Sequence, residues 1–96
     1  EPLAIGVPGT CTRVPVLDGH TETVYCATEK PAPLPEVRRA LRSLGQPLQD
    51  LGLPSMPAQL IGLRDEPNRP QPRLDREAGG GMTTVVGRLR PETVLG

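Results

Sequence analysis

The sequence predicts an α+β domain whose sheet is mixed and mainly antiparallel, with one or two helices against it. Segments rich in β-branched residues alternate along the chain with a segment of helical periodicity. A strong turn signal, Asp18-Gly19, separates the first two strand-like segments. Helix and strands mixed along so short a chain are typical of a sheet covered by few helices.

The first predicted element is a β-hairpin. Residues 10–16 alternate apolar and polar side chains, and residues 21–28 are rich in β-branched side chains, so each segment predicts a strand. Pro15 removes one hydrogen-bond donor from the first strand, which indicates an edge position. The Asp18-Gly19 turn joins the two strands as antiparallel neighbours.

The two cysteines leave two interpretations open. In the predicted hairpin Cys11 lies opposite Cys26, close enough in principle for a cross-strand disulfide. The alternative is a pair of reduced, half-buried thiols in a cytosolic protein, where disulfides are rare. One pair of cysteines is far from a disulfide framework, so the sequence favours the reduced form. Neither cysteine has the local sequence of a catalytic nucleophile.

A single helix is predicted over residues 33–45. Its apolar side chains recur at helical spacing, Pro35 suits the first turn, and Gly45 suits the C-terminal cap. The opposite face carries Arg38, Arg39 and Arg42, which we expect to be solvated.

Two further strands are predicted, at residues 59–64 and 82–90. The segments before them, residues 46–58 and 65–81, are predicted to be loops. Glycines 79–81 lack the surroundings of a phosphate-binding motif and indicate a flexible approach to the last strand.

Composition excludes several classes of protein. Eleven basic and eleven acidic residues cancel, which argues against general electrostatic attraction to nucleic acid or to an anionic membrane. No apolar run is long enough to cross a membrane. We expect Arg69, Arg73 and Arg76 to pair with neighbouring acids such as Asp75, or with a partner surface. Tyr25 is the only aromatic residue, so we expect the chain to rely on another surface for its core.

The candidate functional residues are Arg13 and His20, seven positions apart across the predicted turn. In the hairpin both side chains leave one face, about four residues apart along a strand that rises about 3.4 Å per residue. An arginine can donate two parallel hydrogen bonds to a carboxylate, and a histidine can exchange a proton near neutral pH. The structural alternatives are that His20 only tips a turn and that Arg13 pairs with Asp18 or Glu22. Glu22 is also placed to orient His20 or to contact a substrate amine.

Three stretches together resemble the archaeal and fungal branch of the aspartate-semialdehyde dehydrogenases: residues 12–22, 65–75 and 81–90. The resemblance implies that residues 1–96 are part of a catalytic and dimerisation domain like that of glyceraldehyde-3-phosphate dehydrogenase. It implies a cytoplasmic enzyme that uses NADPH to reduce 4-phospho-aspartate reversibly to the semialdehyde, in the biosynthesis of lysine, threonine and methionine. In that family a cysteine forms a thioacyl intermediate. His20 matches the acid/base histidine, and Arg13 matches the arginine that binds the substrate carboxylate.

The resemblance also implies what this chain leaves to the rest of the enzyme. The Gly-rich nucleotide-binding domain, the Asn-Cys nucleophile and a C-terminal helix are not in the sequence. We therefore expect NADP to bind mainly elsewhere, the chain to be inactive alone, and its partners to be the nucleotide-binding domain and a second subunit. No metal is implied. No role follows for Arg69, Arg73 or Asp75 beyond a possible interface or the rim of the active site.

Three other functions stay open. A related acyl reductase, acting on malonyl-CoA or on N-acetylglutamyl phosphate, would share the cysteine and histidine chemistry. A small secreted binding module held by a Cys11–Cys26 bridge belongs to a different class. The third is a non-catalytic assembly domain that keeps only the dimer surface.

Overall fold

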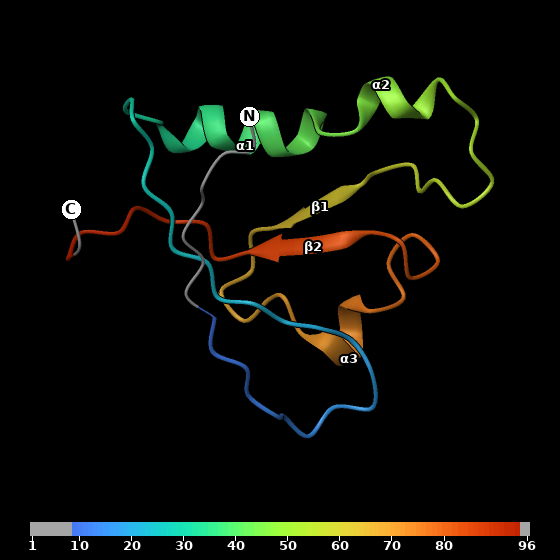
Figure 1. The fold of residues 1–96 in the computed structure, drawn as a ribbon, viewed down its shortest axis with the longest axis horizontal. Helices are drawn as coiled ribbons and strands as arrows, with labels where there is room; N and C mark the ends of the chain where they lie inside the picture. Colours follow the sequence, from blue (N-terminus) through green and yellow to red (C-terminus); the bar gives the residue numbers. More distant parts are fainter. Residues whose placement is uncertain (1–8, 95–96) are drawn as a thin grey trace.

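The computed structural model describes residues 9–94, and their regular structure lies between Leu34 and Gly87. In chain order the elements are α1 (Leu34–Ser43), α2 (Gln46–Gln49), β1 (Ile61–Arg64), α3 (Pro72–Asp75) and β2 (Thr84–Gly87). Figure 1 shows α1 and α2 along one side of the two strands and α3 on the other side. Residues 10–30 run as irregular chain past α3 and then turn back toward the start of α1 (Figure 1).

Helix α1 confirms the one predicted helix. Pro35 occupies its first turn, and its half-buried side chains recur at helical spacing as the helix packs against β1. They are Leu34, Val37 and Leu41. Gly45 follows the end of α1 with a φ of 82°, a left-handed conformation that favours glycine, and it lies against the Leu60 side chain.

The arginines of α1 follow the prediction only in part. Arg39 and Arg42 are exposed. Arg38 is instead half-buried, and its Nη1 donates to Asp65 Oδ1 at 2.5 Å, so it joins α1 to the chain just after β1. The expectation that all three arginines form a solvated face is therefore wrong for Arg38, because the helix packs close to an acidic residue.

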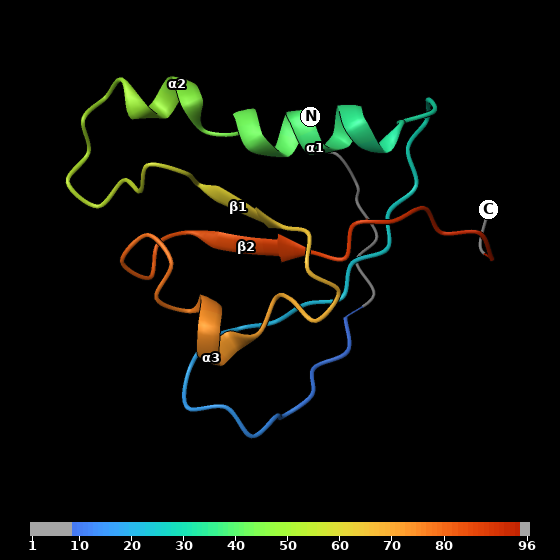
Figure 2. The ribbon, with the colours of Figure 1, turned by 180° about the vertical axis from the view of Figure 1, so that it is seen from behind.

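The sheet is parallel, so the prediction of a mainly antiparallel sheet is wrong. Ile61 pairs with Thr84 and Arg64 with Gly87, in one parallel ladder of two strands. Residues 65–83 form a crossover that contains α3 and returns the chain to the start of β2, as parallel neighbours require. The view from behind in Figure 2 shows the same order of α1, β1, β2 and α3. The two strands lie where the sequence predicts them and are shorter.

The predicted hairpin does not form, since residues 9–33 contain no strand. The Val16 amide donates to the Val14 carbonyl at 2.9 Å, which makes a three-residue turn centred on Pro15 within the first predicted strand. A two-residue hairpin of the expected kind needs positive φ at both turn residues. Gly19 has a φ of 100°, whereas Arg88 is the only non-glycine residue of positive φ between residues 9 and 94, so Asp18 does not fit.

Without the hairpin, the two cysteines have no cross-strand register to share. Cys11 and Cys26 are both free thiols, and both are exposed. The disulfide interpretation is therefore wrong in this structure, and the thiols are more accessible than the half-buried alternative expected.

Two single-turn helices lie in segments predicted to be loops. Each has a proline in its first turn, Pro47 in α2 and Pro72 in α3, and each follows or begins at a glutamine. One turn is too short to show helical periodicity, which is why the sequence pattern missed both helices. In hindsight the Gln-Pro pairs are the available signal, because proline favours the first helical turn.

No apolar side chain is buried among the described residues, apart from the ring of Pro57. Large apolar side chains lie open on several elements, with Leu17 90% exposed and Leu51 64% exposed. None of the helices in residues 9–94 is both long and apolar enough to span a membrane. The exposed apolar side chains agree with the expectation that the chain relies on another surface.

Candidate functional site

Arg13 and His20 lie in the irregular segment 9–33, in which every residue is exposed. Within residues 9–94 no hydrogen bond or ion pair joins these two side chains. The argument that both leave one face of a hairpin no longer holds, because there is no hairpin. Their joint action on a substrate stays a prediction.

His20 has one defined partner, Glu22. Its Nε2 lies 2.8 Å from Glu22 Oε1, and the two side chains are 82% and 66% exposed. When Nε2 donates this hydrogen bond, Nδ1 of a neutral ring is left as an acceptor. The contact supports the possibility, raised by the sequence, that Glu22 orients His20.

The turn before His20 rests on α3. Arg76, at the C-terminal end of α3, donates from Nη1 to Asp18 Oδ1 at 2.8 Å. A Cβ built on Gly19 would lie 3.9 Å from Pro72 Cβ, so the backbone of the turn lies beside the first residue of α3. The sequence pattern does not reveal the role of Asp18, because Asp18 and Arg76 are 58 residues apart and no local pattern links them.

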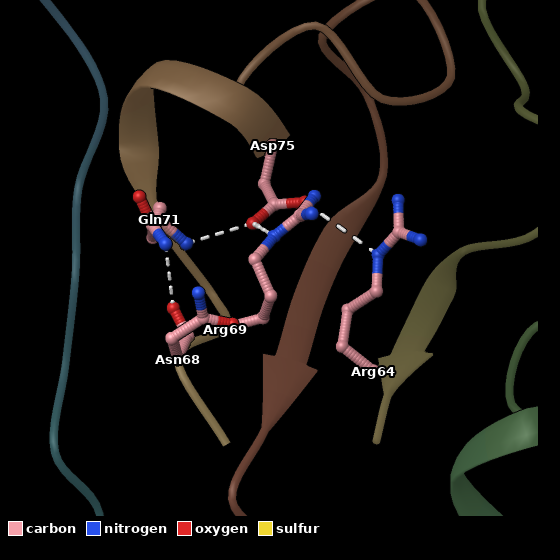
Figure 3. Close-up of polar contacts among 5 residues, drawn as sticks. All are labelled: Arg64, Asn68, Arg69, Gln71 and Asp75. Atoms are coloured by element: carbon pink, nitrogen blue, oxygen red, sulfur yellow. Dashed lines mark hydrogen bonds and ion pairs between the residues drawn. The ribbon is translucent and has the colours of Figure 1, made fainter. Parts of the chain in front are cut away.

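Asp75 is the buried centre of a cluster of charged side chains, shown in Figure 3. Its side chain is only 5% exposed, and it accepts hydrogen bonds from Arg69 Nε at 2.9 Å and from the Gln71 amide at 2.7 Å. Arg69 Nη2 donates to the other carboxylate oxygen, which makes the pair bidentate. Arg64 of β1 adds a third contact, with Nε 3.6 Å from Oδ1. The expectation that the arginines of this segment pair with neighbouring acids is confirmed for Arg69.

This cluster has a clear electrostatic signature. The hydrogen bonds from Arg69, and with smaller effects the Gln71 amide and the charge of Arg64, together lower the pKa of Asp75 to about 2, against an opposing effect of burial. The same hydrogen bond raises the pKa of Arg69 above its ordinary value. Asp75 is therefore ionised at any physiological pH and ties α3 to β1 through Arg64.

The described residues offer no fitting site for a nicotinamide dinucleotide. Glycines 79–81 all have positive φ, but they connect α3 to a strand rather than opening a helix, so no helix N-terminus faces a phosphate there. A hollow lined by Gly62, Arg64, Thr83 and Val85 among others lies on the two strands, away from Arg13 and His20. No group of three or more metal-ligating side chains occurs in the part of the chain that the structure describes.

The sequence matches a family of known proteins over almost its whole length. Residues 2–96 match the model of the family described as semialdehyde dehydrogenase, dimerisation domain. The chain therefore belongs to the semialdehyde dehydrogenase family, as its dimerisation domain, and the resemblance read from the three stretches of sequence is confirmed.

Its similar relatives carry the name aspartate-semialdehyde dehydrogenase. The protein of Methanothermobacter thermautotrophicus is 46% identical over 99% of this chain and 27% of its own length. That of Archaeoglobus fulgidus is 47% identical over 92% of this chain and 24% of its own. That of Cryptococcus neoformans is 48% identical over 93% of this chain and 25% of its own length. The chain thus spans about a quarter of the length of the curated relatives that it matches.

Proposed function

We propose that this chain is the dimerisation-domain part of an NADPH-dependent aspartate-semialdehyde dehydrogenase. The enzyme would convert 4-phospho-L-aspartate reversibly to L-aspartate 4-semialdehyde and phosphate in the cytoplasm, as a step in making lysine, threonine and methionine. The observation that carries this proposal is the 46–48% identity to archaeal and fungal relatives of that name over at least 92% of the chain.

In this proposal Arg13 binds the carboxylate of the substrate. Its planar guanidinium can donate two parallel hydrogen bonds, which fix both the position and the orientation of a carboxylate. The side chain lies on an exposed, irregular segment. It is therefore accessible to a substrate held by the rest of the enzyme.

His20 moves the proton. Glu22 holds Nε2 at 2.8 Å, so Nδ1 is the atom that accepts a proton from a thiol supplied by another part of the enzyme and later returns it to the reacting group. Because the imidazole is 82% exposed in this chain, we propose that the surrounding domain encloses it in the complete enzyme.

In this proposal the nicotinamide cofactor binds to other parts of the enzyme, because the glycines of the described residues do not fit it. We propose two macromolecular partners for the chain, the nucleotide-binding domain of the same enzyme and a second subunit. The exposed apolar side chains, Leu17 and Leu51 among them, support these contacts, as does the dimerisation domain that the family model describes.

The test is an exchange of segments. The quarter of the Methanothermobacter thermautotrophicus protein that matches this chain is replaced by residues 1–96, and oxidation of NADPH is followed with 4-phospho-aspartate as substrate. We expect turnover from this chimera, which we call the exchanged enzyme, and none from the chain alone. Parallel assays with malonyl-CoA and N-acetylglutamyl phosphate test the related reductases. A folded exchanged enzyme that prefers either of these would overturn the proposed substrate.

A further inference from the structure

We propose that the ion pair between Asp18 and Arg76 positions His20, and that both residues are positioning residues for the reaction. The pair fixes the turn that carries His20 onto α3. This inference rests on the acid/base role proposed above for His20, and it adds residues that act on the imidazole through the backbone rather than by contact with substrate.

The first observation is that this attachment is isolated. Among residues 9–94, the Asp18–Arg76 contact of 2.8 Å is the one hydrogen bond or ion pair that joins residues 9–32 to the rest of the chain. All the other polar contacts of that segment are local, such as His20 with Glu22. Since every residue of the segment is exposed, packing within the chain gives little further restraint.

The second observation is that the α3 side of the pair is rigid. Arg76 directly follows Asp75, the most enclosed charged side chain described, which Arg69 and the Gln71 amide hold in place. The Arg76 side chain is itself only 28% exposed, and its Nε is buried without a hydrogen-bond partner among the described atoms. That Nε lies 3.6 Å from Glu77 Oε1, so the guanidinium lies between two acids and offers Nη1 to Asp18.

The third observation is that the turn is short. Asp18 lies two residues before His20, and Gly19 between them lies beside Pro72 of α3. The ring is in turn bonded to Glu22. One end of the five-residue unit 18–22 is therefore anchored on α3, and the imidazole is held within the unit. Because a displacement of about 1 Å in a catalytic group can reduce a rate by about 10²-fold, loss of the anchor has a direct catalytic consequence.

The experiment is a double-mutant cycle in the full-length exchanged enzyme, with Asp18→Ala, Arg76→Ala and the two combined. We expect each single change to lower kcat by about 10-fold while KM changes by less than about 3-fold, within the range of misplacement effects. The double variant should be no worse than either single variant. Arg76→Lys should recover part of the loss, since a lysine keeps the charge. Arg39→Ala, an exposed arginine on α1, is the control and should leave kcat unchanged.

Hydrogen exchange separates this inference from the proposed function. Amides of residues 17–22 should exchange faster in Asp18→Ala and Arg76→Ala and at the original rate in Arg39→Ala. Losses of kcat that add in the double variant would overturn the inference, as would unchanged exchange. The inference would also be overturned if Asp18→Ala and Arg76→Ala exchange faster but keep full kcat, while His20→Ala inactivates the enzyme. If His20→Ala itself keeps full turnover, the role proposed for His20 has failed, and the exchange data alone decide whether the pair anchors the turn.

Discussion

Residues 9–32 and residues 61–87 are organised in opposite ways, although neither segment buries an apolar side chain. The first segment is exposed throughout, forms no strand or helix, and has one polar link to the other described residues, the ion pair of Asp18 with Arg76. The second holds two paired strands and a short helix around Asp75, whose carboxylate has three polar partners. In the absence of a buried apolar core, the regular structure is found around the enclosed carboxylate of Asp75. The candidate catalytic residues lie in the segment that has little order of its own.

The largest expected effect lies in the exposed segment. His20→Ala in the full-length exchanged enzyme should lower turnover by about 10²–10⁴-fold, the usual worth of a general acid/base. The thermal midpoint should change little, because the one hydrogen bond of the ring within the described residues, to the exposed Glu22, is a surface contact. Steady-state kinetics and a melting curve make both measurements. Glu29→Ala, in the same segment and also exposed, serves as control. Unchanged turnover in His20→Ala would remove the proposed role.

The next effect is on stability, in the ordered segment. Asp75→Ala should lower the free energy of unfolding by about 3 kcal/mol, because it leaves Arg69 and the Gln71 amide without their shared acceptor. The urea midpoint of the full-length enzyme measures it. Arg73→Ala should change the same quantity by less than about 0.5 kcal/mol, as expected of an exposed position. Equal effects of the two substitutions would contradict the importance given to the enclosed carboxylate.

Replacing Arg13 tests substrate binding. Arg13→Ala should lower kcat/KM by about 10- to 10²-fold, which corresponds to the loss of hydrogen bonds to a charged group. Arg13→Lys should not restore full activity, since a lysine cannot donate the same planar pair of hydrogen bonds. Arg39→Ala, on the exposed face of α1, is the control. A fully active Arg13→Lys enzyme would argue for a simple charge effect instead.

Two glycines, one from each segment, give a direct comparison. A Cβ on Gly87 would lie 2.3 Å from the Arg69 carbonyl oxygen and 2.8 Å from Pro70 Cδ, whereas a Cβ on Gly9 meets nothing within 4 Å. Gly87→Ala should therefore cost about 2 kcal/mol of stability through overpacking, and Gly9→Ala should be close to neutral. Urea midpoints of both variants decide the point, and equal values would show that β2 and the chain at Arg69 are not packed as described.

The smallest expected effect is a dependence on pH. The Asp75 carboxyl has its pKa lowered from near 4 in the unfolded chain to about 2 in the folded protein. Its contribution to stability is therefore complete above about pH 4 and is lost as the pH falls through about 2. Allowing for screening by solvent, we expect about 1–2 kcal/mol. Urea midpoints measured from about pH 5 down to about pH 2 should fall for the original protein. They should fall less steeply for Asp75→Asn.

Local patterns predicted some elements well. Helix α1, its proline start and its Gly45 end follow from spacing and from the conformations that proline and glycine favour. The places of both strands and the pairing of Arg69 with a neighbouring acid are also correct. These features depend on residues close together in the sequence.

The predicted hairpin does not form, and the sequence pattern shows only part of the physical reason. Pro15 was read as marking an edge strand, but it centres a tight turn that interrupts the strand. The direction of the sheet depends on where the chain returns after β1, which periodicity does not report. The contact between Asp18 and Arg76 joins residues too far apart for any local signal.

The sequence by itself determined the family, the one long helix, the positions of the strands and the candidate pair Arg13 and His20, because each is carried by a contiguous stretch of residues. The tertiary structure alone decided that the strands run parallel, that Asp75 is enclosed and that the turn at Asp18 rests on α3. These features arise when segments distant in the chain meet. Their energies depend on burial and on the distances between charges, and only the folded arrangement sets those.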